Sequence, residues 1–325
     1  MMEDVNEYDA LAGATRVRDI TSNAQSARIL RRLRGNDPRF TSMTINFWSE
    51  DDDNSDPTDN GNEMGYLGHF IGVNKQLKSL RISNFIPEDI NITRQHIELF
   101  FKGLCHNKSI ERLYLTGMAL NGVAYRLLDM NGFFKNNPNF TKLDIYECEL
   151  DRQAISLLPF AQTLKNIRVE FAEMDDKILA ELFRALGMLR RLENLSLVDC
   201  NIGRNSCAEV TRFLQRTDLN LRSLDLGDNS IDDAGIDALV PALPANSKLR
   251  ILRLSSNHSI RASGYQILAT LFESPTSNIT ALDFSYSTID DDGLEALIST
   301  PSSTNVKKLL LSDNPLITEG MADSL

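Results

Sequence analysis

The chain has few of the residues that build metal centres, disulfide frameworks or membrane anchors. Its 325 residues include four cysteines and four histidines, and the histidines follow no spacing that suggests a metal site: His69, His96, His106 and His258. No apolar run is long enough to cross a bilayer. The acidic first ten residues lack the charged and then apolar order of a secretory leader. We therefore expect no metal, no membrane anchor and no secretion.

Sequence signatures of catalysis are also missing. There is no phosphate-binding loop and no dinucleotide-binding glycine pattern, and no Ser or Cys lies in a nucleophile motif. The formal net charge of −11 argues against nucleic acid or an acidic membrane as the main partner. The sequence therefore predicts a protein that is not an enzyme, that carries no cofactor, and that binds neither nucleic acid nor membrane.

What the chain does contain is a short phrase that recurs along most of its length. The phrase reads LRSLDLGDNSI at 221–231 and LENLSLVDCNI at 192–202, and it returns as FTKLDIYECEL at 140–150 and IERLYLTGMAL at 110–120. Apolar residues occupy positions one, four, six and eleven. Asn or Cys is typical of position nine.

The spacing of the phrase predicts one strand and one helix per repeat. Successive position-four residues lie 24 to 37 residues apart: Met43, Leu80, Leu113, Leu143, Ile167, Leu195, Leu224, Leu252, Leu282 and Leu309. That length leaves room for a helix of about three turns after a short strand. In parallel strands, positions four and six then face the core, whereas positions three, five and seven face the opposite side.

Amphipathic segments between the phrases predict helices at 175–186, 233–243, 262–272 and 290–298. Asp175 and Asp176 suit the positive end of the first of these. Pro159 and Pro241 should kink or end their helices. A further helix, capped by Thr21 or Ser22 and stopped at Gly35, should cover the first strand.

This pattern resembles the ribonuclease-inhibitor class of leucine-rich repeats, over residues 37 to 325. The resemblance implies an α/β leucine-rich-repeat solenoid (horseshoe), with parallel strands on the concave face and helices on the convex face. We expect a polar tail and capping helix at 1–36 and a repeat domain at 37–325, with about ten units of which the last is incomplete. Phe85 and Met118 depart from the pattern, because they stand where Asn or Cys is expected.

Repeat register also places the cysteines. Cys148 and Cys200 both fall at position nine, two strand spacings or about 10 Å apart, which is too far for a disulfide. Each should replace Asn as a small buried group facing the loop backbone, while Cys105 and Cys207 fall in helical stretches. We expect reduced thiols in an intracellular, cytoplasmic protein.

An acidic stretch at 50–61 invites a calcium interpretation, but the spacing of a calcium-binding helix–loop–helix site fails. Leu67 stands where that site needs a bidentate Glu. A solvated loop inserted in the first repeat is the better prediction.

The strand positions that face away from the core suggest a docking surface. Large side chains gather in the earlier repeats: Arg81, Arg112, Tyr114, Lys142, Tyr146, Arg168 and Glu170. Interfaces favour Tyr and Arg, which bury much surface and keep a polar tip. Charges also compensate along position five, where Asp144 should neighbour Arg168 and Arg253 should lie between Asp225 and Asp283. A self-neutralising charge ladder on an ordinary surface is the alternative interpretation.

The resemblance implies a non-catalytic intracellular scaffold that holds a protein partner against its concave strand face. Ribonuclease inhibitors, innate-immune sensor tails and actin-associated regulators share this repeat type. One alternative is a GTPase-activating protein of the Ran-activator type, although the acidic tail common there is not seen. Another is the ligand-sensing repeat region of a larger receptor, since no polar cap is visible after the last repeat and a fragment is expected.

Overall fold

The computed structural model describes residues 15–46, 61–83, 94–117, 119–120, 132–274, 276–299 and 305–322. The chain forms two compact units, Met1–Thr163 (unit 1) and Leu164–Leu325 (unit 2). Phe85, Met118 and the acidic residues 50–60 lie outside the described residues. The predicted boundary between residues 36 and 37 stays a prediction.

Unit 1 alternates strands with helices. Its helices are α2 (Val17–Ile20), α3 (Ala24–Arg34), α4 (Gly61–Val73), α5 (Arg94–Leu104), α7 (Phe133–Asn136) and α8 (Arg152–Ile155), with a 3₁₀ turn η1 at Leu158–Phe160. Its strands are β1 (Ser42–Asn46), β2 (Ser79–Ser83), β3 (Arg112–Thr116) and β5 (Lys142–Tyr146), and two short strands, β4 (Ala119–Leu120) and β6 (Glu149–Leu150), pair with each other.

The four long strands of unit 1 are parallel, and their register follows the repeat. Met43 pairs with Leu80, Leu80 with Leu113, and Leu113 with Leu143. Positions four and six are buried as predicted; Leu80, Ile82 and Leu113 are 0% exposed. The repeat around Met43 therefore also contributes a paired strand.

The first helices of unit 1 differ in one detail from the prediction. Helix α3 ends at Gly35 as expected, but its N-cap is Asn23 rather than Thr21 or Ser22, because the Asn23 side chain accepts hydrogen bonds from the backbone N–H groups of Gln25 and Ser26. Helices α4 and α5 cross at Gly68 and Gly103, where an added Cβ would overlap the backbone of the other helix. Close approach of two helices requires glycine there.

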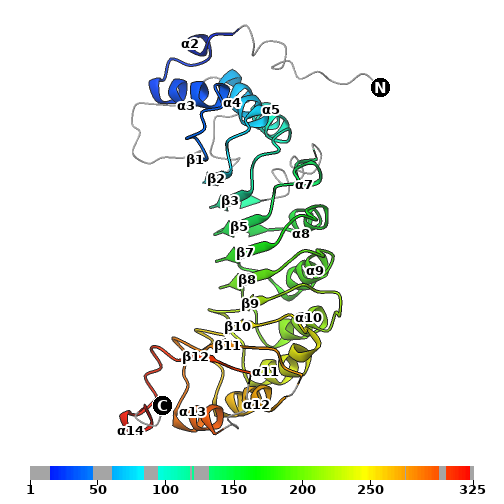
Figure 1. Cartoon of the computed structure of the whole chain (residues 1–325), viewed down its shortest axis with the longest axis vertical. Coiled ribbons are helices and arrows are strands. Elements are labelled where there is room, and N and C mark those ends of the chain that lie inside the picture. Colours follow the sequence, from blue (N-terminus) through cyan, green and yellow to red (C-terminus); the bar gives the residue numbers. More distant parts are fainter. Residues whose placement is uncertain are drawn as a thin grey trace. The chain divides into compact units, whose positions relative to one another are not determined.

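Unit 2 repeats the same alternation more regularly. Its strands are β7 (Asn166–Glu170), β8 (Asn194–Val198), β9 (Ser223–Asp225), β10 (Ile251–Arg253), β11 (Ala281–Asp283) and β12 (Lys308–Leu310). Its helices are α9 (Asp176–Leu186), α10 (Arg204–Leu214), α11 (Asp233–Leu239), α12 (Ala262–Glu273), α13 (Asp291–Ile298) and α14 (Glu319–Ala322), with a 3₁₀ helix η2 at Val240–Ala245. Figure 1 shows these strands side by side, with α9 to α13 along one side of them.

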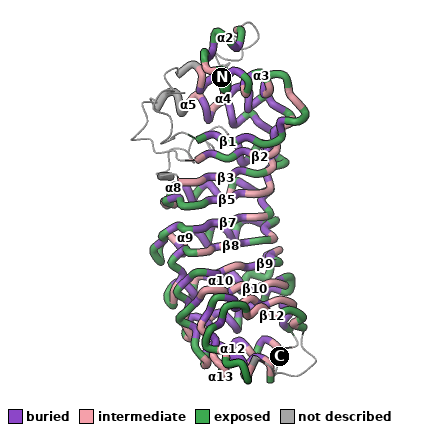
Figure 2. Tube along the Cα trace, turned by 90° about the vertical axis from the view of Figure 1, so that its left-hand side faces the viewer, coloured by how far each residue is buried: buried purple, intermediate pink, exposed green. Residues whose placement is uncertain are grey.

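The strands of unit 2 are also parallel and in repeat register. Ile167 pairs with Leu195, Leu195 with Leu224, Leu224 with Leu252, Leu252 with Leu282, and Leu282 with Leu309. The predicted alignment of position four on neighbouring strands is thus confirmed. Buried and exposed segments alternate around the repeats in Figure 2, as they must when each helix buries one face against the strands.

Aspartate side chains start four of the helices. Asp151, Asp175, Asp232 and Asp290 each accept a hydrogen bond of 2.7–2.9 Å from a backbone N–H in the first turn. Such caps satisfy helix-end donors that have no partner inside the helix. The prediction for Asp175 and Asp176 is confirmed.

Helix lengths vary more than predicted. Helices α9, α10 and α12 have 11 or 12 residues, about three turns, but α8 has four and α11 has seven. In the repeat of α8 only 24 residues separate the position-four residues Leu143 and Ile167. In that of α11, Pro241 converts the continuation to 3₁₀ geometry, as a helix-breaking residue should.

Buried side-chain amides close the strand-to-helix loops. The Asn229 Nδ2 donates to carbonyls of Leu197, Leu226 and Gly227 at 2.8–3.1 Å, and its Oδ1 accepts from the N–H groups of Cys200 and Ile202 at 3.1 and 2.9 Å. Asn257 and Asn314 make equivalent bonds at the same repeat position. These amides satisfy loop backbone groups that water cannot reach.

Candidate protein-binding surface

One group of predicted docking residues lies together on the strand face of unit 1. We call it the basic–aromatic patch: Arg81 on β2, Arg112 and Tyr114 on β3, and Lys142 and Tyr146 on β5. The guanidinium of Arg81 lies 4.8 Å from the centroid of the Tyr114 ring, and the Lys142 Nζ lies 5.7 Å from it. Two cations therefore lie at cation–π distance from one aromatic ring.

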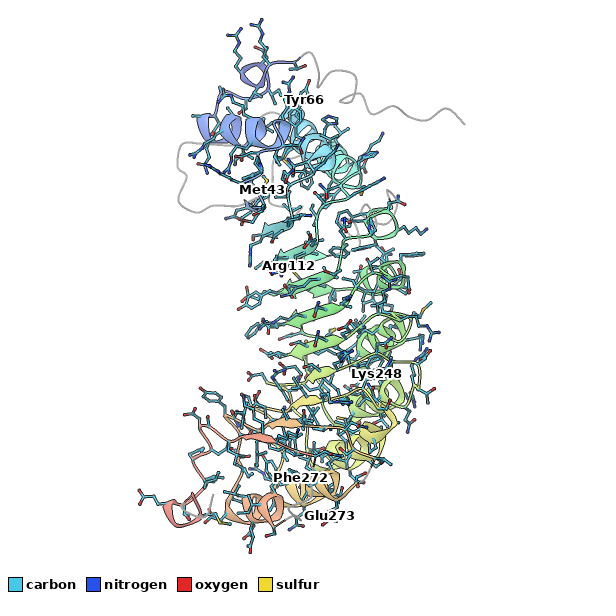
Figure 3. All side chains as sticks on the ribbon, in the orientation of Figure 1. Met43, Tyr66, Arg112, Lys248, Phe272 and Glu273 are labelled. Carbon is cyan, nitrogen blue, oxygen red and sulfur yellow. The ribbon has the colours of Figure 1, made fainter. Side chains whose placement is uncertain are left out.

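Strand register produces this cluster. Arg112 pairs directly with Lys142, and Arg81 pairs with Tyr114, so all four project from the same side of adjacent strands. Arg81 and Arg112 are exposed, and the Tyr146 side chain is 37% exposed. Figure 3 labels Arg112 among the strands of unit 1. Adjacent strands lie about 4.8 Å apart, so these side chains can be covered by one partner.

The patch carries more positive than negative charge. Lys142 has a carboxylate partner on its own strand, since its Nζ lies 3.2 Å from Asp144 Oδ2. Arg81 donates instead to the Thr116 hydroxyl at 3.5 Å. Asp144 is 8% exposed, although its strand position predicted an outward-facing side chain. The patch thus consists of two exposed guanidiniums, the exposed Tyr146 ring, and the half-buried Lys142 ammonium and Tyr114 ring.

The other two predicted docking residues, Arg168 and Glu170, lie on β7 in unit 2. The Arg168 Nε donates to Glu170 Oε1 at 2.6 Å, and Arg168 is exposed whereas Glu170 is 9% exposed. Glu170 therefore differs from the expected anchor: its carboxylate is buried and already holds Arg168 in place. The compensation expected between Asp144 and Arg168 would join the two units and stays a prediction.

Charges on the later strands follow the predicted ladder. Burial raises the pKa of Asp225 above its usual value, against the lowering effects of the Gly227 N–H and the Arg253 guanidinium; Asp283 raises it further. Arg253 also donates to the Ser223 hydroxyl at 3.1 Å. The neighbouring strands β9, β10 and β11 place Arg253 between Asp225 and Asp283, as predicted.

Comparison with known proteins agrees with this repeat geometry. A family model described as leucine-rich repeat matches residues 218–240, 245–267 and 277–297. Ribonuclease inhibitor from Sus scrofa is 27% identical over 246 residues, which cover 73% of this chain and 52% of that protein. The chain is a leucine-rich-repeat protein of the ribonuclease-inhibitor-like class.

Other relatives of this leucine-rich-repeat protein are much longer than it. NACHT, LRR and PYD domains-containing protein 5 from Homo sapiens is 27% identical over 198 residues, covering 57% of this chain and 16% of that protein. The chain spans about one half of the curated ribonuclease inhibitor and about one sixth of the NACHT relative.

Solved structures with a similar fold include an internalin from Listeria monocytogenes. It is 15% identical, with a TM-score of 0.43, and the match covers 94% of this chain and 93% of that chain. The crystal structure of a TLR13–ssRNA13 complex is 17% identical, with a TM-score of 0.47, and the match covers 84% of this chain and 33% of that chain.

Two cysteines of the leucine-rich-repeat protein, Cys148 and Cys200, bond to loop backbone groups, as predicted. The Cys148 Sγ donates to the carbonyls of Leu115 and Tyr146, and the Cys200 Sγ to those of Val169 and Val198. They thereby replace the Asn amides as donors. All four cysteines are buried thiols outside any disulfide, and burial raises the pKa of Cys105, Cys200 and Cys207 to about 12.

Neither a metal cluster nor a membrane span is found in the part of the chain that the structure describes. No three His, Cys, Asp or Glu residues there are grouped so that they could hold a metal ion. Likewise, no helix among the described residues is long and apolar enough to cross a membrane. His258 is exposed.

The sequence analysis did not predict a role for position eight, which directly precedes position nine of the repeat. Seven non-glycine residues there have positive φ between 51° and 56°: Glu147, Phe171, Asp199, Asp228, Ser256, Tyr286 and Asp313. Two of these side chains are aromatic, and Phe171 and Tyr286 are 46% and 59% exposed. Position eight is thus a left-handed turn that displays its side chain to solvent.

Proposed function

We propose that this protein is a non-catalytic binding scaffold that holds a protein partner against the strand face, and that the basic–aromatic patch of unit 1 is a docking surface. The observation that carries the proposal is the pair of cations, Arg81 and Lys142, held over one Tyr114 ring on that face. The family supports it, because proteins of this repeat type are generally binding scaffolds.

The chemistry of the patch indicates what the partner should present. Tyr and Arg are the side chains that most often dominate interface energies, because they bury a large area and pair through polar tips. Arg112 is exposed, and among the described residues it has neither an ion pair nor a side-chain hydrogen bond. A partner with carboxylates near an apolar segment would therefore meet both the cations and the phenol rings.

The test uses a partner captured from the native source by the full chain and then identified and purified. We expect Tyr114→Ala and Tyr146→Ala each to weaken its binding by about tenfold or more, the range of interface hot spots. Tyr146 is 37% exposed, so its replacement should leave the thermal transition nearly unchanged. Tyr114→Phe should retain most of the affinity, because the ring still faces both cations.

A matched control is Tyr286→Ala, which removes a more exposed tyrosine from unit 2. Tyr286 is 59% exposed and lies on a turn outside the patch. If this variant weakens binding as much as Tyr146→Ala does, or if neither patch variant weakens it, the patch is not the docking surface.

A second candidate function is the ligand-sensing repeat region of a larger receptor. It is favoured by the match to the human NACHT, LRR and PYD domains-containing protein, of which this chain would represent one sixth. Sequencing the transcript on both sides of the printed chain tests it. A nucleotide-binding domain encoded in the same reading frame supports the receptor, and stop codons bordering the repeats on both sides contradict it.

A further inference from the structure

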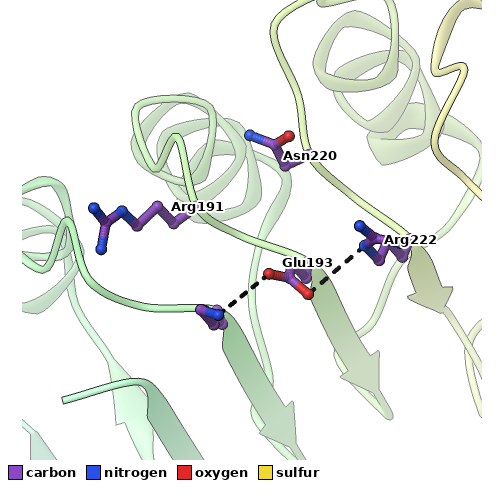
Figure 4. A pocket seen from close by; sticks show the side chains of 5 residues that line it. Arg191, Glu193, Asn220 and Arg222 are labelled. Atoms are coloured by element: carbon purple, nitrogen blue, oxygen red, sulfur yellow. Dashed lines mark ion pairs between the residues drawn. The ribbon is translucent and has the colours of Figure 1, made fainter. Parts of the chain in front are cut away.

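A cavity opens in unit 2 at the edge where the chain enters strands β7, β8 and β9. Its volume is about 310 Å³, and Lys165, Arg191, Glu193, Asn220 and Arg222 line it (Figure 4). We call it the edge cavity. It lies at the start of the strands, whereas the residues proposed above for docking lie on the strands of unit 1.

Backbone hydrogen bonds fix the spacing of the edge cavity. Lys165, Glu193 and Arg222 immediately precede β7, β8 and β9. The Glu193 N–H donates to the Lys165 carbonyl at 2.8 Å, and the Arg222 N–H donates to the Glu193 carbonyl at 2.7 Å. The three side chains therefore start from neighbouring strands about 4.8 Å apart, with the carboxylate in the middle.

The cations of the edge cavity keep hydrogen-bond donors available. Lys165 Nζ lies 3.6 Å from Glu193 Oε1, and Arg222 Nε lies 3.7 Å from Glu193 Oε2. Both distances allow charge attraction but exceed hydrogen-bonding distance. Within the described ranges, the Arg191 side chain makes no ion pair or hydrogen bond. All three cations are exposed, so an incoming anion can reach them.

The charge of the edge cavity matches a phosphate monoester. Three cations and one carboxylate leave a formal charge of 3 − 1 = +2. A phosphorylated side chain carries about −1.5 to −2 near neutral pH, whereas Asp or Glu carries about −1 and would leave one cation uncompensated. Arginine guanidiniums also present paired N–H donors that fit phosphate oxygens.

Size and overall charge favour a phosphorylated peptide over other phosphates. The volume of about 310 Å³ equals the share of about ten liquid waters, which exceeds what one phosphate group fills. The net charge of −11 on the chain opposes a long polyanion such as nucleic acid. We propose that the edge cavity binds a phosphoserine or phosphothreonine side chain of a partner protein. This inference does not depend on the basic–aromatic patch.

The proposal is tested by titrating the full chain with a terminally blocked phosphoserine pentapeptide. Binding is monitored by calorimetry and by the NMR resonances of the arginine Nε–H groups. We expect Arg191→Gln and Arg222→Gln each to weaken binding by about tenfold, and their resonances to shift in the wild type. Glu193→Gln should strengthen binding several-fold, because it raises the formal charge of the cavity to +3 and frees both neighbouring cations. A purely structural role of Glu193 would not predict stronger binding.

Lys177→Gln is the matched control, because it also removes one exposed cation from unit 2 but lies on α9 and does not line the cavity. Its affinity should equal that of the wild type. The same peptide with unmodified Ser or with Glu should bind at least about tenfold more weakly. The proposal is overturned if the wild type does not bind the phosphopeptide, if Glu193→Gln weakens binding, or if inorganic phosphate or a single-stranded oligonucleotide binds as tightly.

Discussion

Replacing Asn229 by Ala should cost more stability than any surface change in this protein. The side chain is 8% exposed and joins two repeats, since its amide bonds backbone groups of residues 197–202 as well as those of its own loop. Alanine fills the space of the Cβ and removes both the donor and the acceptor.

The magnitude follows from the backbone groups that would lose their partner. The Cys200 and Ile202 N–H groups donate to Asn229 Oδ1 at 3.1 and 2.9 Å. A buried donor left without an acceptor costs about 1–3 kcal/mol, so the two together predict a loss of about 2–6 kcal/mol in the free energy of unfolding. The Gly227 carbonyl contributes less, because it also accepts from the Asp199 N–H at 3.2 Å.

Urea unfolding followed by circular dichroism measures this loss. Asn229→Cys should be intermediate, because a thiol restores donation as at Cys200 but does not accept the two N–H bonds well. Asn205→Ala is the control: Asn205 is exposed on α10 and makes one side-chain bond at 3.3 Å, so its loss should stay within about 0.5 kcal/mol. A cost below about 1 kcal/mol for Asn229→Ala would refute the role of the buried amides.

Two further predictions concern titration and thiol chemistry. Because burial raises the folded-state pKa of Asp225, its protonated carboxyl group favours the folded state at low pH, and this contribution is lost as pH rises through the folded pKa. The stability of Asp225→Asn relative to wild type should therefore increase between about pH 3.5 and about pH 6, as measured by urea unfolding; equal differences would contradict it. Burial also raises the pKa of three cysteines to about 12, so a chromogenic disulfide reagent should modify no thiol in the native protein and all four after denaturation. Reaction of any thiol before unfolding would show that the sites are open.

The repeat register was predictable from the sequence because it depends on hydrophobic period alone. Position-four residues such as Leu195 and Leu224 must be buried, and a slip by one residue would turn every side chain to the other face. The pairing of these residues on β8 and β9 confirms the register. Helix starts were predictable for the same local reason, because Asp175 and Asp290 can cap without tertiary help.

Other features depend on distances that no sequence pattern contains. Glu170 and Asp144 occupy outward-facing strand positions, yet both are buried, and each lies beside a cation of its own strand, Arg168 and Lys142 respectively. The edge cavity was not predicted from the sequence. Its residues stand at position two of the repeat and in the helix-to-strand loops, where apolar residues do not recur at a fixed spacing. Burial of a charged side chain and the shape of a cavity follow from packing.

Different positions of the repeat close its loop and form its strand face, which explains why the strand face can carry a docking surface. Buried Asn or Cys side chains satisfy loop backbone groups, and position eight accepts the left-handed turn. At position five, Asp225 and Asp283 also accept from a backbone N–H two residues further on, so fewer demands fall on positions three and seven. Side chains at those positions can then change with little effect on folding. Arg81, Arg112 and Tyr114 cost side-chain entropy when a partner orders them, and the core does not require them. The docking proposed above would give these three side chains a role on the strand face of unit 1 that the core does not supply.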